Sequence, residues 1–207
     1  MLQVHHLNNS RSQRILWLLE ELQHPYEIVK YQRLKPVPLA PPELKKIHPL
    51  GKSPVIVDGG KTIAESAAIV EYIIDTYGKG SMKPAPHTDD YWKYIEWLHF
   101  AEGSAMLPFL LALYTGLLGE GGAPLRPRID SEIANHLSYL EAGIKGREFF
   151  VGTDLTGADI QLLFVLEGAG ARLSSYPELV QYRERMQARP AYKRAIEKGG
   201  EYALMSR

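Results

Sequence analysis

The sequence predicts a two-domain α+β protein, with a first domain of mixed strands and helices and a second domain that is helical throughout. Three observations lead to this fold class. Residues 1–80 follow the order β-α-β-α-β-β-α, no strand-like alternation comes after them, and a segment rich in glycine and proline separates the two patterns. We therefore expect domains over residues 1–80 and 87–207, joined by a linker over residues 78–88.

The first domain begins with a predicted β-α-β unit. Leu2–Val4 is a short strand candidate, and Tyr26–Lys30 alternates between apolar and polar residues as a second strand does. Between them, apolar residues in Arg14–Leu22 recur at helical spacing, which leaves Glu20 and Glu21 facing outward. The proline that follows should end this helix, because proline disfavours helical angles in the residue before it.

The rest of the first domain carries strong turn signals. Four prolines between residues 35 and 42 predict an extended loop, and a short helix is expected at residues 43–47. Asp58-Gly59-Gly60 separates two short apolar runs, which is typical of a β-hairpin. Apolar residues at helical spacing predict a helix over Glu65–Tyr77. This order of elements is that of a thioredoxin-like domain.

Beyond residue 88 every periodic segment is helical. A long helix is predicted over Asp90–Thr115, with a bend at Pro108, because proline removes a backbone hydrogen bond from a helix. Further helices are expected at residues 129–145, 157–169, 177–188 and 190–198.

The composition excludes several classes of function. Lysine and arginine number 24 and aspartate and glutamate 24, so that no basic excess supports binding to a nucleic acid. The longest apolar stretch, residues 105–118, is too short to cross a bilayer, and the N-terminus lacks the pattern of a signal peptide. We therefore expect no nucleic-acid partner, no membrane partner and a cytoplasmic location.

Cysteine and metal chemistry are also unexpected. The chain has no cysteine, which excludes disulfides, thiolate zinc sites and cysteine nucleophiles. The histidines lack metal-ligand spacing, and His5 and His6 should point to opposite faces of a strand. We expect no metal.

Two short motifs point to a ligand site. A turn runs into Ser53-Pro54 just before a predicted strand, and Glu65-Ser66 opens a predicted helix. A strand edge beside a helix N-terminus suits a peptide-like ligand that carries a carboxylate. Each motif alone is more often an ordinary turn or helix cap, so their order and spacing together carry the argument.

These motifs resemble the glutathione-binding signature of the cytosolic glutathione transferase family, in its serine-type members, over essentially the whole chain. The resemblance implies a cis bond before Pro54, with the backbone of Ser53 binding the cysteine of glutathione. It also implies that Ser66 receives the γ-glutamyl carboxylate and that Glu65 helps to hold the amino group. Most members carry a branched apolar residue in place of Ser53, a change that should matter little for a backbone contact. A third match, Thr156–Ile160, resembles a family helix cap and is a folding signal.

Such a site must stabilise a thiolate, because the thiol of glutathione is mostly protonated at neutral pH. Serine-type members place a catalytic hydroxyl four residues before an arginine, which here corresponds to Ser10 and Arg14. Asn9 is the alternative, and Ser10 could also serve only as a helix cap. The residues after the first strand include no tyrosine, so a tyrosine mechanism is not expected.

Other site residues follow less directly. Lys52 is a candidate for the glycyl carboxylate of glutathione or a solvated loop lysine, and Arg11 is a weaker candidate for the same charge. Phe109 and Tyr114 are candidates for walls of the electrophile pocket, although aromatic residues on long helices more often pack in a core. Family members form homodimers, in which Glu102 could reach the glutathione of the neighbouring subunit.

The leading hypothesis is a homodimeric enzyme that activates glutathione as a thiolate and adds it to small hydrophobic electrophiles in detoxification. Glutathione serves as co-substrate, and reduction of organic hydroperoxides is an accessible side activity. The alternative is a non-catalytic binding or assembly module, because the same fold can serve unrelated functions.

Overall fold

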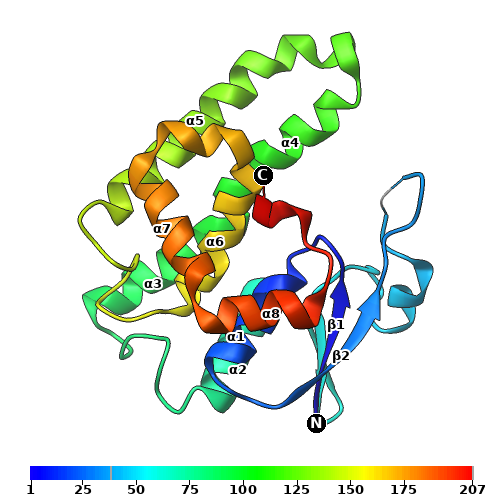
Figure 1. The fold of residues 1–207 in the computed structure, drawn as a ribbon, viewed down its shortest axis with the longest axis vertical. Helices are drawn as coiled ribbons and strands as arrows, with labels where there is room; N and C mark the ends of the chain where they lie inside the picture. The colour runs from blue at the N-terminus through cyan, green and yellow to red at the C-terminus, as the bar shows by residue number, and fades with distance from the viewer. Residues whose placement is uncertain (38, 207) are drawn as a thin grey trace. The chain divides into compact units, whose positions relative to one another are not determined.

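The structure is a computed structural model that describes residues 1–37 and 39–206. Pro38, one of the four prolines in the predicted extended loop, and Arg207 lie outside the described residues. The expected order, β-α-β-α-β-β-α followed by helices, is confirmed (Figure 1). The first part has the predicted thioredoxin-like fold.

The chain divides into two compact units, and its last helix belongs with the first of them. One unit combines Met1–Lys83 with Met186–Met205, and Pro84–Arg185 form the body of the other. The C-terminal segment therefore returns to the strands and helices with which the chain begins. The limits 1–80 and 87–207, and the linker over 78–88, remain a prediction.

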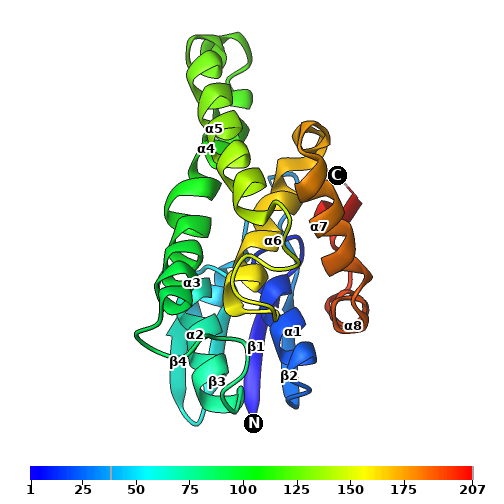
Figure 2. The same ribbon diagram turned by 90° about the vertical axis from the view of Figure 1, so that its left-hand side faces the viewer.

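A four-stranded mixed sheet forms the centre of the first unit, in the order β2-β1-β3-β4 (Figure 2). Its strands are β1 (Leu2–Leu7), β2 (Tyr26–Tyr31), β3 (Val55–Asp58) and β4 (Lys61–Ala64). β1 pairs parallel with β2 and antiparallel with β3, and the predicted hairpin joins β3 to β4. β1 continues three residues past the predicted Val4, because its pairing with β2 extends to Leu7, and Nδ1 of both His5 and His6 finds a hydrogen-bond partner inside the unit.

Helix α1 (Ser12–Glu21) is the centre of packing in this unit. It contacts β1, α2 (Ser66–Tyr77) and α8 (Pro190–Gly199), so that nearly all of its side chains are buried. Figure 1 shows α8 running beside α1. Residues Pro42–Lys46 form a 3₁₀ turn where a short helix was expected.

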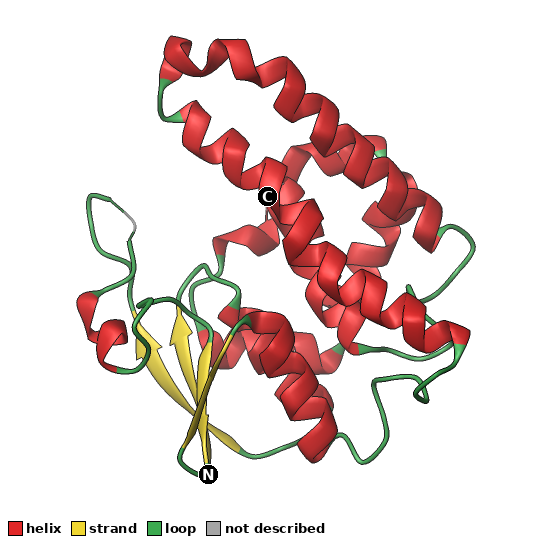
Figure 3. Cartoon of the chain, turned by 180° about the vertical axis from the view of Figure 1, so that it is seen from behind, coloured by secondary structure: helices red, strands yellow, loops and turns green. Residues whose placement is uncertain are grey.

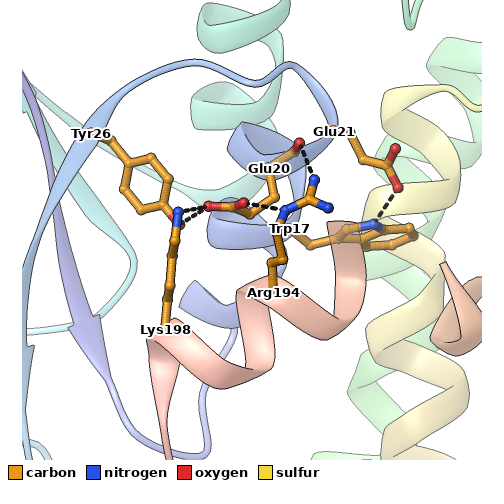
Figure 4. A network of polar contacts seen from close by, with 6 residues as sticks. All are labelled: Trp17, Glu20, Glu21, Tyr26, Arg194 and Lys198. Atoms are coloured by element: carbon orange, nitrogen blue, oxygen red, sulfur yellow. Dashed lines mark hydrogen bonds and ion pairs between the residues drawn. The ribbon is translucent and has the colours of Figure 1, made fainter. Parts of the chain in front are cut away.

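Glu20 and Glu21 do not face outward as predicted. The carboxylate of Glu20 is buried, and it accepts hydrogen bonds from Lys198, from Nε of Arg194 at 2.9 Å and from the hydroxyl of Tyr26 at 2.8 Å (Figure 4). The prediction was wrong because the cations that pair with Glu20 come from a helix far later in the chain: Arg194 is 174 residues from Glu20 and Lys198 is 178 residues from it.

Glu21 forms a second link between α1 and the segment around α8. Its carboxylate accepts hydrogen bonds from Nε of Arg189 at 2.6 Å and from Nη2 of Arg189 at 3.0 Å. The indole of Trp17 also donates to it at 2.7 Å (Figure 4). A two-point contact between guanidinium and carboxylate fixes direction as well as distance. The position of α8 is therefore set by charge pairs and by apolar contact with α1.

The second unit consists of helices and loops (Figure 3). Its helices are α3 (Asp89–Phe100), α4 (Met106–Gly116), α5 (Arg126–Ile144), α6 (Gly157–Ala169) and α7 (Pro177–Ala188). The 3₁₀ segments Gly119–Leu125 and Gly170–Ser175 follow α4 and α6. The predicted boundaries of α6 and α7 match the structure.

The single helix predicted over residues 90–115 is interrupted. A π-helical turn at Ala101–Ala105 separates α3 from α4, and Pro108 lies in the first turn of α4. Proline at position 108 has no N–H for the carbonyl of Ser104, and its ring crowds that carbonyl. The wider turn relieves this conflict, so the irregularity precedes the proline instead of being centred on it.

Helix α6 is buried on all sides and begins with the predicted cap. The carboxylate of Asp159 accepts hydrogen bonds from the backbone N–H of Thr156 at 2.9 Å and from that of Phe150 at 3.0 Å. The hydroxyls of Thr156 and Tyr182 donate to it at 2.9 and 2.8 Å. Burial raises the pKa of Asp159, and these four donors oppose that effect.

Glu20→Gln should lower the free energy of unfolding by about 1–2 kcal/mol at neutral pH, because two half-exposed cations lose their charged partner. Burial alone would raise the pKa of Glu20, but the hydrogen bonds from Lys198, Arg194 and Tyr26 hold it below its ordinary value. The stabilisation is therefore present above about pH 4 and is lost as the pH falls further. Urea unfolding across this range measures it, and the exposed Glu27→Gln serves as the control. An equal loss in both variants would contradict the assignment.

Asp159→Ala should lower the free energy of unfolding by about 3–5 kcal/mol, because buried donors lose their acceptor. Thermal and denaturant unfolding measure this loss. Asp154→Ala removes an exposed carboxylate from the same loop and should stay within about 0.5 kcal/mol of the parent protein. Similar losses in the two variants would show that burial of the cap is unimportant.

Candidate functional site

Ser10 lies in the short loop between β1 and α1, and its side chain is buried. Its hydroxyl oxygen accepts a hydrogen bond from the backbone N–H of Ser12, the first residue of α1, at 3.2 Å. Ser10 is not the helix cap itself, because Arg11 holds that position, but it does accept a hydrogen bond from the first N–H of the helix. It uses the oxygen of the hydroxyl as acceptor, which leaves the O–H of Ser10 available as a donor.

The side chain of Ser12 connects Ser10 to the end of β1. Oγ of Ser12 lies 2.8 Å from Oγ of Ser10 and 2.8 Å from Nδ1 of His6. The backbone N–H of Leu7 donates to Oγ of Ser12 at 3.2 Å. Burial lowers the pKa of His6 to about 4, and the charge of Lys30 adds to this effect.

Sequence reasoning singled out neither Ser12 nor His6. One signal was available: His6 lies one residue before the end of β1 and Ser12 begins the next helix, so that a short loop brings them together. The hydrogen bond itself depends on how α1 packs against β1, which periodicity does not reveal.

Asn9 faces a different set of partners. It adopts a φ of 52°, in the left-handed region that asparagine tolerates better than most residues. Its amide nitrogen donates to Oε1 of Glu201 at 3.4 Å, and its carbonyl oxygen accepts from the backbone N–H of Ala203 at 2.6 Å. The amide of Asn8 donates to Glu201 as well, at 3.3 Å. The segment after α8 therefore holds the loop that carries Ser10.

Ser53 lies where β3 approaches the end of β1. The Ser53-Pro54 bond is cis, as the resemblance implied. The hydroxyl of Ser53 donates to the carbonyl of His5 at 2.8 Å and accepts from the N–H of Leu7 at 3.2 Å. These bonds extend the contact between the strands beyond the paired residues His5 and Val55. The serine side chain therefore has a structural task that an apolar residue would not perform.

The N-terminus of α2 lies within reach of α1. Ser66 is the buried first residue of α2, and its hydroxyl accepts a hydrogen bond from Nη1 of Arg14 at 3.2 Å. Glu65 before it is exposed and has a φ of 69°. A non-glycine residue held in this region costs about 1–3 kcal/mol, and such residues cluster at ligand sites. Free N–H groups and a cation next to a helix N-terminus favour an anion.

The remaining candidate residues differ in exposure and position. Lys52 is exposed on the turn before Ser53, and Arg11 occupies the cap position of α1. In the second unit, Phe109 is buried on α4, which is the core packing considered for it, whereas Tyr114 is 61% exposed. Glu102 lies in the π-helical turn.

Within residues 1–37 and 39–206, no three His, Asp or Glu side chains gather where they could hold a metal ion. In that part of the chain, no helix combines the length and apolarity needed to span a bilayer.

Comparison with known proteins assigns both halves of the chain to one family. Residues 2–75 match the glutathione S-transferase N-terminal domain, and residues 125–199 match the glutathione S-transferase C-terminal domain. Glutathione S-transferase 3 of Schizosaccharomyces pombe is 37% identical, over 96% of this chain and 88% of the relative.

Solved structures agree with this assignment. A glutathione S-transferase from Actinobacillus pleuropneumoniae is 37% identical with a TM-score of 0.89, covering 99% of this chain and 95% of that one. A glutathione transferase of Phanerochaete chrysosporium, solved with oxidized glutathione, is 26% identical with a TM-score of 0.79, covering 96% and 94%. Together with the thioredoxin-like unit and its Ser53-Pro54 and Glu65-Ser66 motifs, these matches show that the chain belongs to the glutathione S-transferase family.

Proposed function

We infer that the protein is a glutathione transferase, which activates glutathione as a thiolate and adds it to electrophilic small molecules. One observation carries the inference. A buried hydroxyl just before α1, that of Ser10, lies in a unit that also carries the cis Ser53-Pro54 bond ahead of β3 and an anion-favouring helix N-terminus at Ser66. The alternative of a non-catalytic assembly module is not favoured, because relatives over most of the chain are named as transferases.

We propose that glutathione is bound mainly through groups of the first unit. The backbone of Ser53 would pair with the cysteine of glutathione in the manner of an added strand. The N-terminus of α2 at Ser66 would receive the γ-glutamyl carboxylate, and Glu65 would hold the amino group. Lys52 would lie toward the glycyl carboxylate, where its exposed charge can act through solvent.

Thiol activation sets the energetic demand on this site. A thiol pKa of about 8.5 must fall by about 2 units, which corresponds to about 2.7 kcal/mol in favour of the anion. A hydrogen bond to a charged group contributes about 1.5–3 kcal/mol. A helix N-terminus adds about 0.3–1 kcal/mol. One hydroxyl donor at the start of α1 is therefore sufficient.

Ser10 is the proposed donor, and Asn9 is the second candidate. The amide of Asn9 already donates to Glu201, whereas Ser10 can turn its O–H toward the sulfur. The thiol proton leaves to solvent, and the thiolate forms the new carbon–sulfur bond with the electrophile. A displaced group, where there is one, leaves with its electron pair. The same thiolate could attack a hydroperoxide oxygen as a side reaction.

The second unit is the proposed source of the electrophile pocket. Tyr114 is available at the surface of α4 for this role, and Phe109 supports the same helix from inside. Detoxification, a cytoplasmic location and the absence of a metal remain predictions.

We also propose that the protein is a homodimer. The second unit exposes Leu107 and Leu111, one turn apart on α4, which are 53% and 42% exposed, and Leu118 just beyond that helix, which is 65% exposed. Soluble monomers rarely leave a contiguous apolar surface of this kind uncovered. A second copy of the chain is the occupant that the resemblance implies.

Ser10→Ala should lower kcat/KM for conjugation by about 10²-fold, because the thiolate loses a hydrogen bond of about 1.5–3 kcal/mol. Glutathione affinity should change little. Steady-state rates with a nitroaryl halide measure the first effect, and calorimetric titration of glutathione measures the second. Asn9→Ala is the comparison variant, and a larger rate loss in Asn9→Ala would assign activation to that residue instead.

Leu111→Glu combined with Leu107→Glu should convert the dimer to a monomer, because two charges would be buried against the partner. Sedimentation or light scattering measures the mass. Leu50→Glu changes a leucine of similar exposure in the first unit and should leave the mass unchanged. A monomeric parent protein would contradict the proposal.

A further inference from the structure

A chain of three buried side chains runs from β1 to Ser10. Nδ1 of His6, Oγ of Ser12 and Oγ of Ser10 follow one another at 2.8 Å and 2.8 Å. The three residues are 2%, 0% and 6% exposed. All three belong to the first unit.

When a thiolate is bound, the available hydrogens limit the direction in which the side chains can donate hydrogen bonds to one another. A serine hydroxyl has one hydrogen and two acceptor lone pairs. If the hydrogen of Ser10 goes to sulfur, its oxygen can accept from the N–H of Ser12 and from the O–H of Ser12. The oxygen of Ser12 then accepts from the N–H of Leu7 and from Nδ1–H of His6. In this arrangement each hydroxyl both donates and accepts. The carbonyl of Leu7, 3.3 Å from Oγ of Ser12, is a competing acceptor for the Ser12 hydrogen, at a longer distance than Ser10.

If the hydrogen bonds run in the opposite direction, Ser12 competes with the sulfur for the hydrogen of Ser10. If Nδ1 of His6 carries no hydrogen, the O–H of Ser12 donates to it. Oγ of Ser12 then competes with the ligand as the acceptor for the O–H of Ser10. The outcome therefore depends on the tautomer of His6. The charge of His6 is not involved, because burial lowers its pKa to about 4, although a hydrogen bond with the backbone of Gly199 acts in the opposite direction.

We propose that Ser12 and His6 are positioning residues that direct the hydroxyl of Ser10 toward the sulfur of glutathione. Neutral His6 donates from Nδ1 to Ser12, and Ser12 donates to Ser10, which frees the Ser10 hydrogen for the thiolate. Each bond also polarises the next, so Ser10 becomes a stronger donor. This inference rests on the proposed function and extends it to two residues that do not touch the ligand.

Ser12→Ala tests the first link. The apparent pKa of bound glutathione, measured from the ultraviolet absorbance of the thiolate against pH, should rise by about one unit, since one hydrogen bond in the chain is lost. The rate at neutral pH should fall about ten-fold and recover at higher pH, with little change in KM for glutathione. Leu7 keeps a partner in this variant, because its N–H also donates to Ser53. Ser81→Ala, at the far end of α2, is the control and should change neither quantity.

A pair of substitutions at His6 tests the second link. His6→Phe removes the donor and should raise the pKa of bound glutathione in the same way, whereas His6→Asn keeps an amide donor near the position of Nδ1 and should restore most of the shift. This pair also decides the matter if Ser12→Ala does not fold.

The experiments distinguish failure of this inference from failure of the proposed function. An unchanged thiol pKa in Ser12→Ala, or equal behaviour of His6→Phe and His6→Asn, would overturn the positioning role while Ser10→Ala still raised the pKa. If Ser10→Ala also left the pKa unchanged, or if glutathione did not bind the parent protein, the assignment of Ser10 or the function itself would be wrong.

Discussion

The charge pairs between α1 and the C-terminal segment fix how the two ends of the chain pack together in the first unit. Glu20 and Glu21 lie at the end of α1, and they receive Arg194, Lys198 and Arg189 from the far end of the chain. A buried carboxylate is costly unless it is paired and hydrogen-bonded, so α8 and α1 are mutually dependent. The start of α1, with Ser12, has contacts of its own with His6, Leu7 and Ser10.

The backbone N–H of Leu7, at the end of β1, bonds to residues on both sides of the proposed site. It donates both to Ser12, which leads to Ser10, and to Ser53, which leads to the cis Ser53-Pro54 turn. The hydroxyls of Ser12 and Ser53 thus both accept from the last N–H of β1, which would otherwise be an unpaired donor. This N–H therefore links the proposed activating residue, Ser10, to the proposed backbone contact with glutathione at Ser53.

Local sequence signals recovered the elements well and the polar contacts between them poorly. The cap at Asp159 was readable because Thr156 lies three residues before it, and a capping box needs only that spacing. The break before α4 was predicted in part, since Pro108 indicated a bend in the helix but not the π-helical turn that precedes it. Glu20 was misjudged, because helical spacing identifies an outward face only when nothing packs on it.

The sequence by itself determined the order of elements and the helix-start motif, because these depend on spacings of a few residues, over which backbone geometry is predictable. The cis bond before Pro54 and the choice of Ser10, with Asn9 as the alternative, came from the resemblance of its motifs to those of the family. Only the tertiary structure decided that Glu201 engages Asn9 and that Ser12 and His6 reach Ser10. Hydrogen bonds of this kind join segments that meet through packing, and their distances of 2.8–3.4 Å have no counterpart in the linear pattern.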